Sequence, residues 1–262
     1  MKITKSLIVL CVIMTFACKD NTKKAVEIAS ETAEEMHQTT VPDSLEIIPI
    51  EHATMILAYK ETVIYVDPVG GIGSFKDQEK PSYVLVTDIH GDHMDPATLN
   101  EMDLTNTILI VPKAVKDKLP AELKTKETVV LNNGESKSFD DLKVEAIPMY
   151  NLRKEALKFH EKGRGNGYII TLGDERIYIS GDTEDIPEMR NLKDIDVAFV
   201  CMNLPYTMTV ESAASAVLEF KPKKVYPYHY RGTEGLSDVD KFKSIVTSEN
   251  PDIEVVQLDW YE

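Results

Sequence analysis

The chain has 262 residues, of which 43% are hydrophobic, and this is enough to bury the core of one α/β domain. Its formal net charge is −15, and the sequence contains no basic cluster large enough to bind a nucleic-acid backbone. Nucleic acid is therefore not an expected partner.

The amino-terminal segment has the features of a targeting signal. Two lysines give it a short basic start, and residues 6–17 form an apolar run that is shorter than a typical membrane-spanning helix. The run ends in Thr15-Phe16-Ala17-Cys18, which resembles a bacterial lipobox. We therefore predict a lipoprotein signal peptide over residues 1–17 and membrane attachment through an acylated Cys18. The alternatives are an uncleaved membrane anchor and a secretory signal that is cleaved near Ala17.

This segment predicts a location in the bacterial cell envelope, lipid-anchored on the periplasmic or the outer face. Residues 18–44 are polar and rich in Lys, Glu, Thr and Ser, and we expect them to form a tether. The folded domain then covers residues 45–262. Because Cys11 lies in the removed segment and Cys18 would be acylated, Cys201 has no partner and no disulfide is expected.

Short apolar and β-branched runs between turn residues predict many strands in the folded domain. They cover residues 46–50, 53–58, 62–66, 83–86, 107–111, 127–131, 142–148, 167–172, 176–179, 197–201, 224–228 and 253–258. Apolar residues at helical spacing from Val210 to Leu218 predict a helix capped by Thr209. Ser237 with Asp240 predicts the start of another helix. This order favours an α/β fold in which two sheets pack together under helices.

The loop after the fourth predicted strand carries the chemistry. It places Asp88, His90, Asp92 and His93 within six positions. Imidazole and carboxylate groups are the donors that Zn²⁺, Mn²⁺ and Fe²⁺ prefer. The chain has six histidines in all, so two of them among aspartates in one loop favour a metal site over a solvated acidic turn.

Two later strands end in residues of the same kind. Gly181-Asp182-Thr183 follows the strand at residues 176–179, and His229 follows the strand at residues 224–228. A carboxylate at a strand end can bridge two cations and hold them about 3.5–4 Å apart. Taken alone, the first motif is equally a turn or a helix cap, and a lone histidine is usually a core residue. With the metal loop in hand, we predict that both belong to the metal site, because sites gather at strand ends.

The segment Thr87-Asp88-Ile89-His90-Gly91-Asp92-His93 resembles the His-x-His-x-Asp-His signature of the metallo-β-lactamase superfamily, with aspartate in place of the first histidine. The order of the motifs along the chain is also similar. The resemblance extends from about residue 45 to the carboxyl end, and it implies a four-layer αββα sandwich. Glu51-His52-Ala53-Thr54 and Tyr65-Val66-Asp67-Pro68 resemble motifs of the branch that holds ascorbate-phosphate lactonase and N-acyl-phosphatidylethanolamine phospholipase D.

The resemblance implies a centre of two divalent metal ions. The first would be bound by Asp88 and His90, the second by Asp92, His93 and His229, and Asp182 would bridge them. Asp67 would not bind the metal itself but would orient one of its histidine ligands, since metal-bound imidazoles usually need a carboxylate partner. Zn²⁺ is the expected metal. The carboxylate of Asp88 would either move the preference towards Mn²⁺ or Fe²⁺ or weaken metal binding at the first site.

One ligand of the first metal is left open by the sequence. The family places a histidine after the strand that ends at Pro148, where this chain has Met149-Tyr150-Asn151. Either the following loop folds back and brings His160 to the metal, which we favour, or Asn151 serves as a weaker ligand.

Together these residues predict a metal-dependent hydrolase. A hydroxide held between the two cations and oriented by Asp92 would attack a small ester, lactone or phosphodiester. We expect His52 and Tyr206, with Asn203 as a further candidate, to stabilise developing charge or to protonate the leaving group. For His52 the alternative is a strand histidine with a satisfied hydrogen bond and no role in the site.

Three basic residues, Lys162, Arg164 and Arg231, could contact an anionic substrate, although solvent-exposed positions are the default for all three. The alternatives to a hydrolase are a metal-binding lipoprotein of the same fold without turnover, and a surface scaffold for a partner protein. The sequence leaves the substrate and the oligomeric state open.

Overall fold

The computed structural model describes residues 44–261. The predicted signal peptide at residues 1–17, the acylated Cys18 and the tether as far as residue 43 lie outside the described residues. Within residues 44–261, no helix combines the length and the apolar composition needed to cross a bilayer.

The first sheet has six strands in the order β1-β2-β3-β4-β5-β6. These strands are β1 (Glu46–Glu51), β2 (Thr54–Tyr59), β3 (Thr62–Val66), β4 (Tyr83–Leu85), β5 (Ile108–Val111) and β6 (Glu127–Val130). The pairs from β1 to β3 are antiparallel, and those from β3 to β6 are parallel. The carboxyl ends of β3 and β4 therefore meet at the same edge of the sheet.

The second sheet has seven strands in the order β15-β12-β11-β10-β9-β8-β7. These strands are β7 (Ser136–Ser138), β8 (Leu142–Met149), β9 (Gly165–Leu172), β10 (Glu175–Ile179), β11 (Val197–Cys201), β12 (Lys224–Tyr228) and β15 (Glu254–Val255). β10, β11, β12 and β15 are parallel to one another. A separate small hairpin pairs β13 (Arg231–Gly232) with β14 (Gly235–Leu236).

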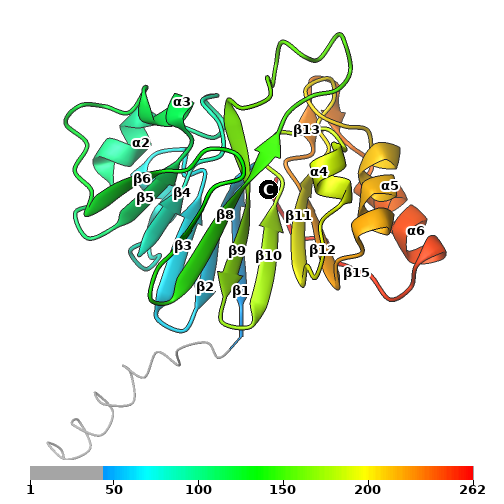
Figure 1. Ribbon diagram of the computed structural model, residues 1–262, viewed down its shortest axis with the longest axis horizontal. Coiled ribbons are helices and arrows are strands. Elements are labelled where there is room, and N and C mark those ends of the chain that lie inside the picture. The colour runs from blue at the N-terminus through cyan, green and yellow to red at the C-terminus, as the bar shows by residue number, and fades with distance from the viewer. Residues whose placement is uncertain (1–43, 262) are drawn as a thin grey trace, which may run out of the picture. The chain divides into compact units, whose positions relative to one another are not determined.

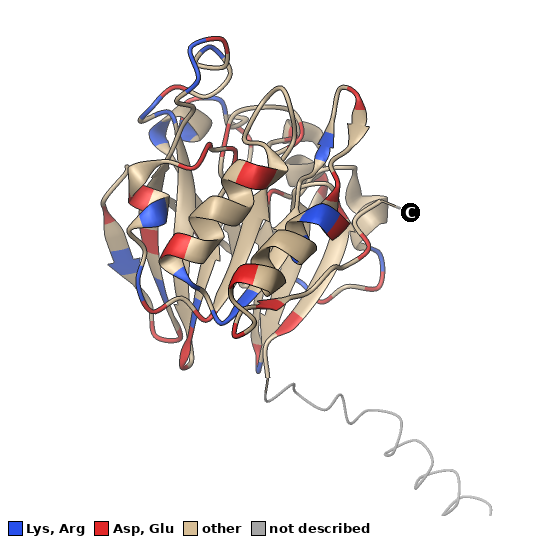
Figure 2. Cartoon of the chain, turned by 90° about the vertical axis from the view of Figure 1, so that its right-hand side faces the viewer, with Lys and Arg blue, Asp and Glu red and all other residues tan. Residues whose placement is uncertain are grey.

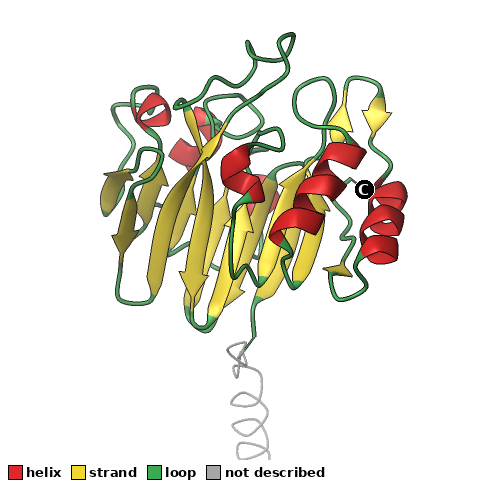
Figure 3. Cartoon of the chain, turned by 45° about the vertical axis from the view of Figure 1, so that its right-hand side comes forward, coloured by secondary structure: helices red, strands yellow, loops and turns green. Residues whose placement is uncertain are grey.

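Helices cover the outer faces of the two sheets (Figure 1, Figure 3). They are the 3₁₀ helix η2 (Ile72–Phe75) and the α-helices α2 (Pro96–Glu101), α3 (Lys113–Lys116), α4 (Pro187–Arg190), α5 (Val210–Phe220) and α6 (Val239–Glu249). In Figure 1, α2 and α3 lie beside the first sheet, and α4, α5 and α6 lie beside the second. This is the layer order that the predicted αββα sandwich requires.

The alternation of side chains along each strand supplies both faces of the first sheet with apolar residues. Leu57 of β2 faces the second sheet and packs in one cluster with Ile170 of β9. Its neighbour Ile56 faces the other way and packs with Val84 of β4 and Leu99 of α2. A strand buried on both faces in this way is typical of a sheet inside a sandwich.

The described secondary structure contains most of the predicted strands and both predicted helices, and it adds the short helices η2, α3 and α4, which were not predicted. Strand β7 and the small hairpin were not predicted, and the strand expected at residues 253–258 is only the two residues of β15. Thr209 caps α5 as predicted, with its side chain accepting from the Ser212 amide. The helix predicted after Ser237 is confirmed as α6, but its predicted cap was wrong: the N-cap is Asp238, and the Ser237 hydroxyl donates to the Met202 carbonyl.

Asp141 joins the two sheets at the start of β8, and its removal should destabilise the fold in a pH-dependent way. The hydroxyls of Thr62 and Tyr83, on the first sheet, donate to its two carboxylate oxygens at 2.6 Å each. Desolvation alone would raise the pKa of Asp141, but these bonds to the ionised form hold the pKa below its ordinary value. The resulting stabilisation is present above the unfolded-state pKa of about 3.9 and is lost as the pH falls through the lower folded-state pKa.

We therefore expect Asp141→Ala to lower the free energy of unfolding by about 1 kcal/mol at pH 7, because the carboxylate is near the surface. The difference from the wild type should shrink at pH 3. Urea denaturation at both pH values measures it, with Asp140→Ala as the control that leaves both values unchanged. A loss that is equally large at pH 3 would contradict this role for Asp141.

Candidate metal centre

The candidate ligands lie where parallel strands of both sheets end. Asp67 follows β3, the loop of residues 88–93 follows β4, Asp182 follows β10 and His229 follows β12. The Asp67 amide donates to the carbonyl of Leu85 at 2.9 Å, which fixes the end of β3 against the end of β4. Residues that are far apart in the sequence therefore meet at one edge of the sandwich.

His93 lies at the centre of the site and is fully buried. Its Nδ1 atom lies 2.7 Å from Oδ2 of Asp67, and its Nε2 atom lies 3.3 Å from Oδ2 of Asp182. Asp67 is held in turn by the amide and the hydroxyl of Thr87, at 2.7 and 2.6 Å. Burial alone would lower the pKa of His93, but the carboxylates of Asp182 and Asp67 raise it well above its ordinary value. The pocket around His93 therefore attracts positive charge.

His93, Asp182 and His229 form a buried set of donors that could hold a metal ion, which we call the second donor group. The Nε2 atoms of His93 and His229 face each other at 3.0 Å, and Nε2 of His229 lies 3.2 Å from Oδ1 of Asp182. Burial would raise the pKa of Asp182, but the three neighbouring histidines hold it well below its ordinary value. Its Oδ1 atom is buried without a hydrogen-bond donor. A divalent cation among these atoms would satisfy that oxygen, so the residues fit a metal ion.

Asp88, His90 and His160 form another such set, which we call the first donor group. Nδ1 of His90 lies 2.9 Å from Oδ2 of Asp88. Nε2 of His160 lies 3.0 Å from Oδ2 of Asp182, the carboxylate that also contacts the second donor group. Asp182 thus lies between the two groups, in the place that the sequence predicts for a bridging ligand.

The geometry favours His160 over Asn151 as the remaining ligand. The side-chain nitrogen of Asn151 donates to the carbonyls of Ala156 and Tyr206, at 2.9 and 2.7 Å. Its backbone amide donates to the carbonyl of His160 at 3.0 Å. Asn151 therefore holds the loop that brings His160 to Asp182.

We predict that variants of these two residues have opposite effects. His160→Ala should lower the zinc content of the reconstituted protein below that of the wild type, with little effect on the melting temperature of the metal-free protein. Asn151→Ala should retain the wild-type zinc content but lose about 1–3 kcal/mol of stability, because one buried and one partly buried carbonyl lose their donor. Zinc analysis and thermal melting measure both, and the reverse pattern would assign the ligand to Asn151.

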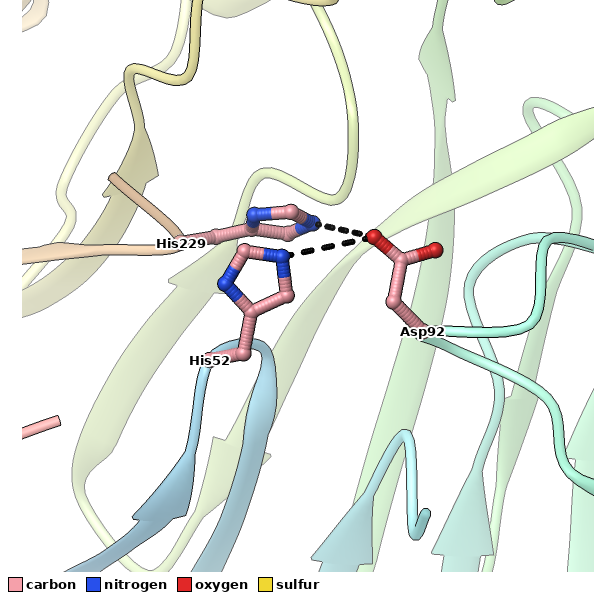
Figure 4. A group of neighbouring side chains, drawn as sticks. All are labelled: His52, Asp92 and His229. Carbon is pink, nitrogen blue, oxygen red and sulfur yellow. Dashed lines mark ion pairs between the residues drawn. The ribbon is translucent and has the colours of Figure 1, made fainter. Parts of the chain in front are cut away.

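Asp92 and His52 lie on the open side of the second donor group, beside His229 (Figure 4). Oδ2 of Asp92 is 3.4 Å from Nε2 of His52 and 3.5 Å from Nε2 of His229. The Asp92 side chain is 43% exposed, whereas those of His93 and His229 are fully buried, so Asp92 is the ligand candidate of this group that a substrate can approach. Desolvation would raise the pKa of Asp92, but hydrogen bonds from His229 and His52 lower it, and the carboxylate is ionised at neutral pH.

Tyr261 orients His52 and was not identified from the sequence. Its hydroxyl lies 2.7 Å from Nδ1 of His52, and it accepts hydrogen bonds from the backbone amides of Tyr230 and Arg231 at 3.0 and 3.1 Å. Since both lone pairs of the hydroxyl are occupied, its proton is directed to Nδ1 of His52, and Nε2 becomes the donor that faces Asp92. A contact across 209 positions leaves no local signal in the sequence.

Tyr206, expected at the site, lies with its ring 5.1 Å from that of Phe159, and its backbone carbonyl anchors Asn151. Arg231 is exposed and pairs with Glu51 at 3.1 Å, and Lys162 pairs with Glu188 at 2.6 Å. These contacts give each of the three residues a structural partner.

Comparison with known proteins identifies similar chains. The family model described as "Beta-lactamase superfamily domain" matches residues 46–229. A UPF0173 metal-dependent hydrolase of Pyrococcus horikoshii is 30% identical over 177 residues, which cover 66% of this chain and 76% of the relative. One from Thermoplasma acidophilum is 28% identical over 213 residues, which cover 78% of this chain and 91% of the relative.

Solved structures give the same picture. A protein of Parabacteroides distasonis assigned as a metal-dependent hydrolase superposes with a TM-score of 0.72 at 38% identity, covering 81% of this chain and 92% of the other. Igni18, a metallo hydrolase of Ignicoccus hospitalis, superposes with a TM-score of 0.69 at 22% identity, covering 83% of this chain and 96% of the other, and shows likeness of fold. The two packed sheets and their helices are thus confirmed as the metallo-β-lactamase fold.

Proposed function

Because this chain belongs to the beta-lactamase superfamily and is a metal-dependent hydrolase of that fold, we propose that two divalent cations act together in its site. The first donor group would hold one cation and the second donor group, completed by Asp92, the other. The observation that carries this proposal is the position of Asp182, whose carboxylate contacts His160 of one group and His93 and His229 of the other.

The proposed reaction is hydrolysis of a small ester, lactone or phosphodiester. Bound cations would lower the pKa of water towards neutrality and polarise the group under attack. Asp92 would orient the attacking water, because its ionised and partly exposed carboxylate can accept a hydrogen bond from that water. His52 would donate a hydrogen bond from Nε2 to the charge that develops on the substrate, with Tyr261 fixing its orientation. Tyr206, whose ring packs against Phe159 next to His160, would also stabilise this charge or protonate the leaving group.

Zn²⁺ is the first candidate metal, and the carboxylate of Asp88 supports Mn²⁺ or Fe²⁺ as alternatives. The likeness to ascorbate-phosphate lactonase and N-acyl-phosphatidylethanolamine phospholipase D stays a prediction about substrate class. So does attachment to the bacterial cell envelope through Cys18. A small-molecule substrate likewise stays a prediction. On the face that carries α5 and α6, Lys and Arg are scattered among Asp and Glu (Figure 2).

Metal removal and reconstitution test the proposal. Metal-free protein should not hydrolyse bis-p-nitrophenyl phosphate or a simple lactone, and two equivalents of Zn²⁺, Mn²⁺ or Fe²⁺ should restore turnover of at least one of them. Restored activity that saturates at two equivalents supports the two-metal proposal. Tight metal binding without turnover of any ester, lactone or phosphodiester would favour a metal-binding protein of the same fold.

A further inference from the structure

Arg164 contacts two of the three side chains of the first donor group. Its Nε and Nη2 atoms donate to Oδ1 and Oδ2 of Asp88 at 3.0 and 2.6 Å, and Nη2 lies 3.3 Å from Nε2 of His90. The side chain of Asp88 is fully buried, and that of Arg164 is 18% exposed. A two-pronged arginine–carboxylate bond shielded from water is a strong and oriented interaction. The guanidinium is therefore part of the wall of the first donor group.

The backbone around Arg164 is fixed to the metal loop. The amide of Asn166 donates to the carbonyl of Thr87, next to Asp88, at 2.9 Å. A Cβ atom on Gly165 would lie 2.8 Å from that same carbonyl, so a glycine is needed for this close approach. Nη2 of Arg164 also donates to the carbonyl of Phe159 at 2.6 Å. Both ends of the pair with Asp88 are thus held by the fold.

The two donor groups differ in charge because of this pair. Asp182 belongs to the second group and also contacts His160 of the first. In the first group the charge of Asp88 is cancelled by Arg164, so the pair has the same net charge as a neutral imidazole. The second group has Asp92 beside it and Asp67 behind His93, which adds two carboxylates. A divalent cation therefore meets a more negative environment at the second donor group than at the first.

Resting on the proposed two-metal function, we propose that Arg164 weakens metal binding at the first donor group, so that the two cations bind with unequal affinity and the second group fills first. Arg164 acts here as a positioning residue through Asp88. Its charge sets how much free metal the protein needs before both positions are occupied. This replaces the expectation that Arg164 contacts an anionic substrate.

Titration of metal-free protein with Zn²⁺ by calorimetry, and with Co²⁺ by its visible absorption, tests this proposal. The wild type should bind two equivalents in separate steps. Arg164→Met should tighten the weaker step roughly tenfold or more, because a positive charge beside the cation is removed, and should leave the tighter step unchanged. Arg164→Lys keeps the charge and should keep both steps. Lys162→Met, on the same loop but paired with Glu188, is the matched control and should change neither step.

Thermal melting of the metal-free variants shows whether they are folded. A further variant, Arg164→Gln, loses the charge but keeps hydrogen-bond donors, and it should tighten the weaker binding step as Arg164→Met does. Equal affinities in the wild type would overturn the proposal, as would a weaker step that stays the same or loosens in both uncharged variants. If the two donor groups bind metal with unequal affinity but the protein shows no turnover, only the proposed function is contradicted. If they bind metal with equal affinity in an active hydrolase, only this inference is contradicted.

Discussion

Replacing Asp182 with alanine should leave a folded protein that binds at most one metal ion and has lost nearly all hydrolytic activity. This carboxylate is the one that contacts histidines of both donor groups, at 3.0 to 3.3 Å. Without it, two cations would face each other with no protein carboxylate between them. Loss of several kcal/mol of transition-state stabilisation corresponds to a fall of roughly a thousandfold in kcat/KM.

Metal analysis after dialysis and steady-state kinetics at saturating zinc measure the effect of Asp182→Ala. The matched control is Asp185→Ala, which removes a carboxylate three positions away that pairs with Arg190 at 2.5 Å. The control should retain two equivalents of metal and wild-type activity. Retention of two tightly bound ions by Asp182→Ala would show that another group bridges the cations.

Replacing Asp67 with asparagine should weaken metal binding at the second donor group ten- to a hundredfold, the usual effect of removing a carboxylate that orients a metal-bound imidazole. Asp67 accepts the Nδ1 proton of His93, which leaves Nε2 free to face Asp182 and His229. The amide nitrogen of an asparagine would donate to Nδ1 instead. The imidazole proton would then move to Nε2 and block the nitrogen that binds the metal.

Zinc affinity, measured by competition with a chelator, is the direct test of the Asp67→Asn variant, and activity should return at high zinc concentration. Asp95→Asn is a suitable control, because Asp95 caps α2 by accepting from the Ala97 amide at 3.0 Å and asparagine caps helices equally well. It should leave zinc affinity unchanged. An unchanged affinity in Asp67→Asn would mean that His93 is oriented by Thr87 or by the packing around it.

The metal loop could be predicted because its information is local. Asp88, His90, Asp92 and His93 lie within six positions after a strand of apolar residues, and the structure places all four at one site. Asp182 and His229 carried weaker signals, but both end buried strands, and parallel strands deliver their ends to one edge of a sheet. Strands with clear apolar alternation could also be predicted, because the alternation is visible within a few neighbouring residues.

Contacts that depend on loop conformation could not be predicted. The choice between His160 and Asn151 rests on three hydrogen bonds that fold residues 151–160 back on the sandwich. Arg164 was expected to face a substrate, and only the structure shows its pair with Asp88 across 76 positions. Tyr261 contacts His52 although the two residues lie at opposite ends of the domain's sequence. At the start of α6, Ser237 and Asp238 are both suitable N-cap residues. Asp238 is the cap in the structure, because the Ser237 hydroxyl donates to the Met202 carbonyl instead.

Anomalous X-ray scattering from crystals equilibrated with excess zinc would show where the cations bind. We expect two peaks about 3.5–4 Å apart, one next to Asp88, His90 and His160 and one next to Asp92, His93 and His229, with Asp182 between them. A single peak away from Asp182, or no peak among these residues at full zinc saturation, would contradict the metal centre described here.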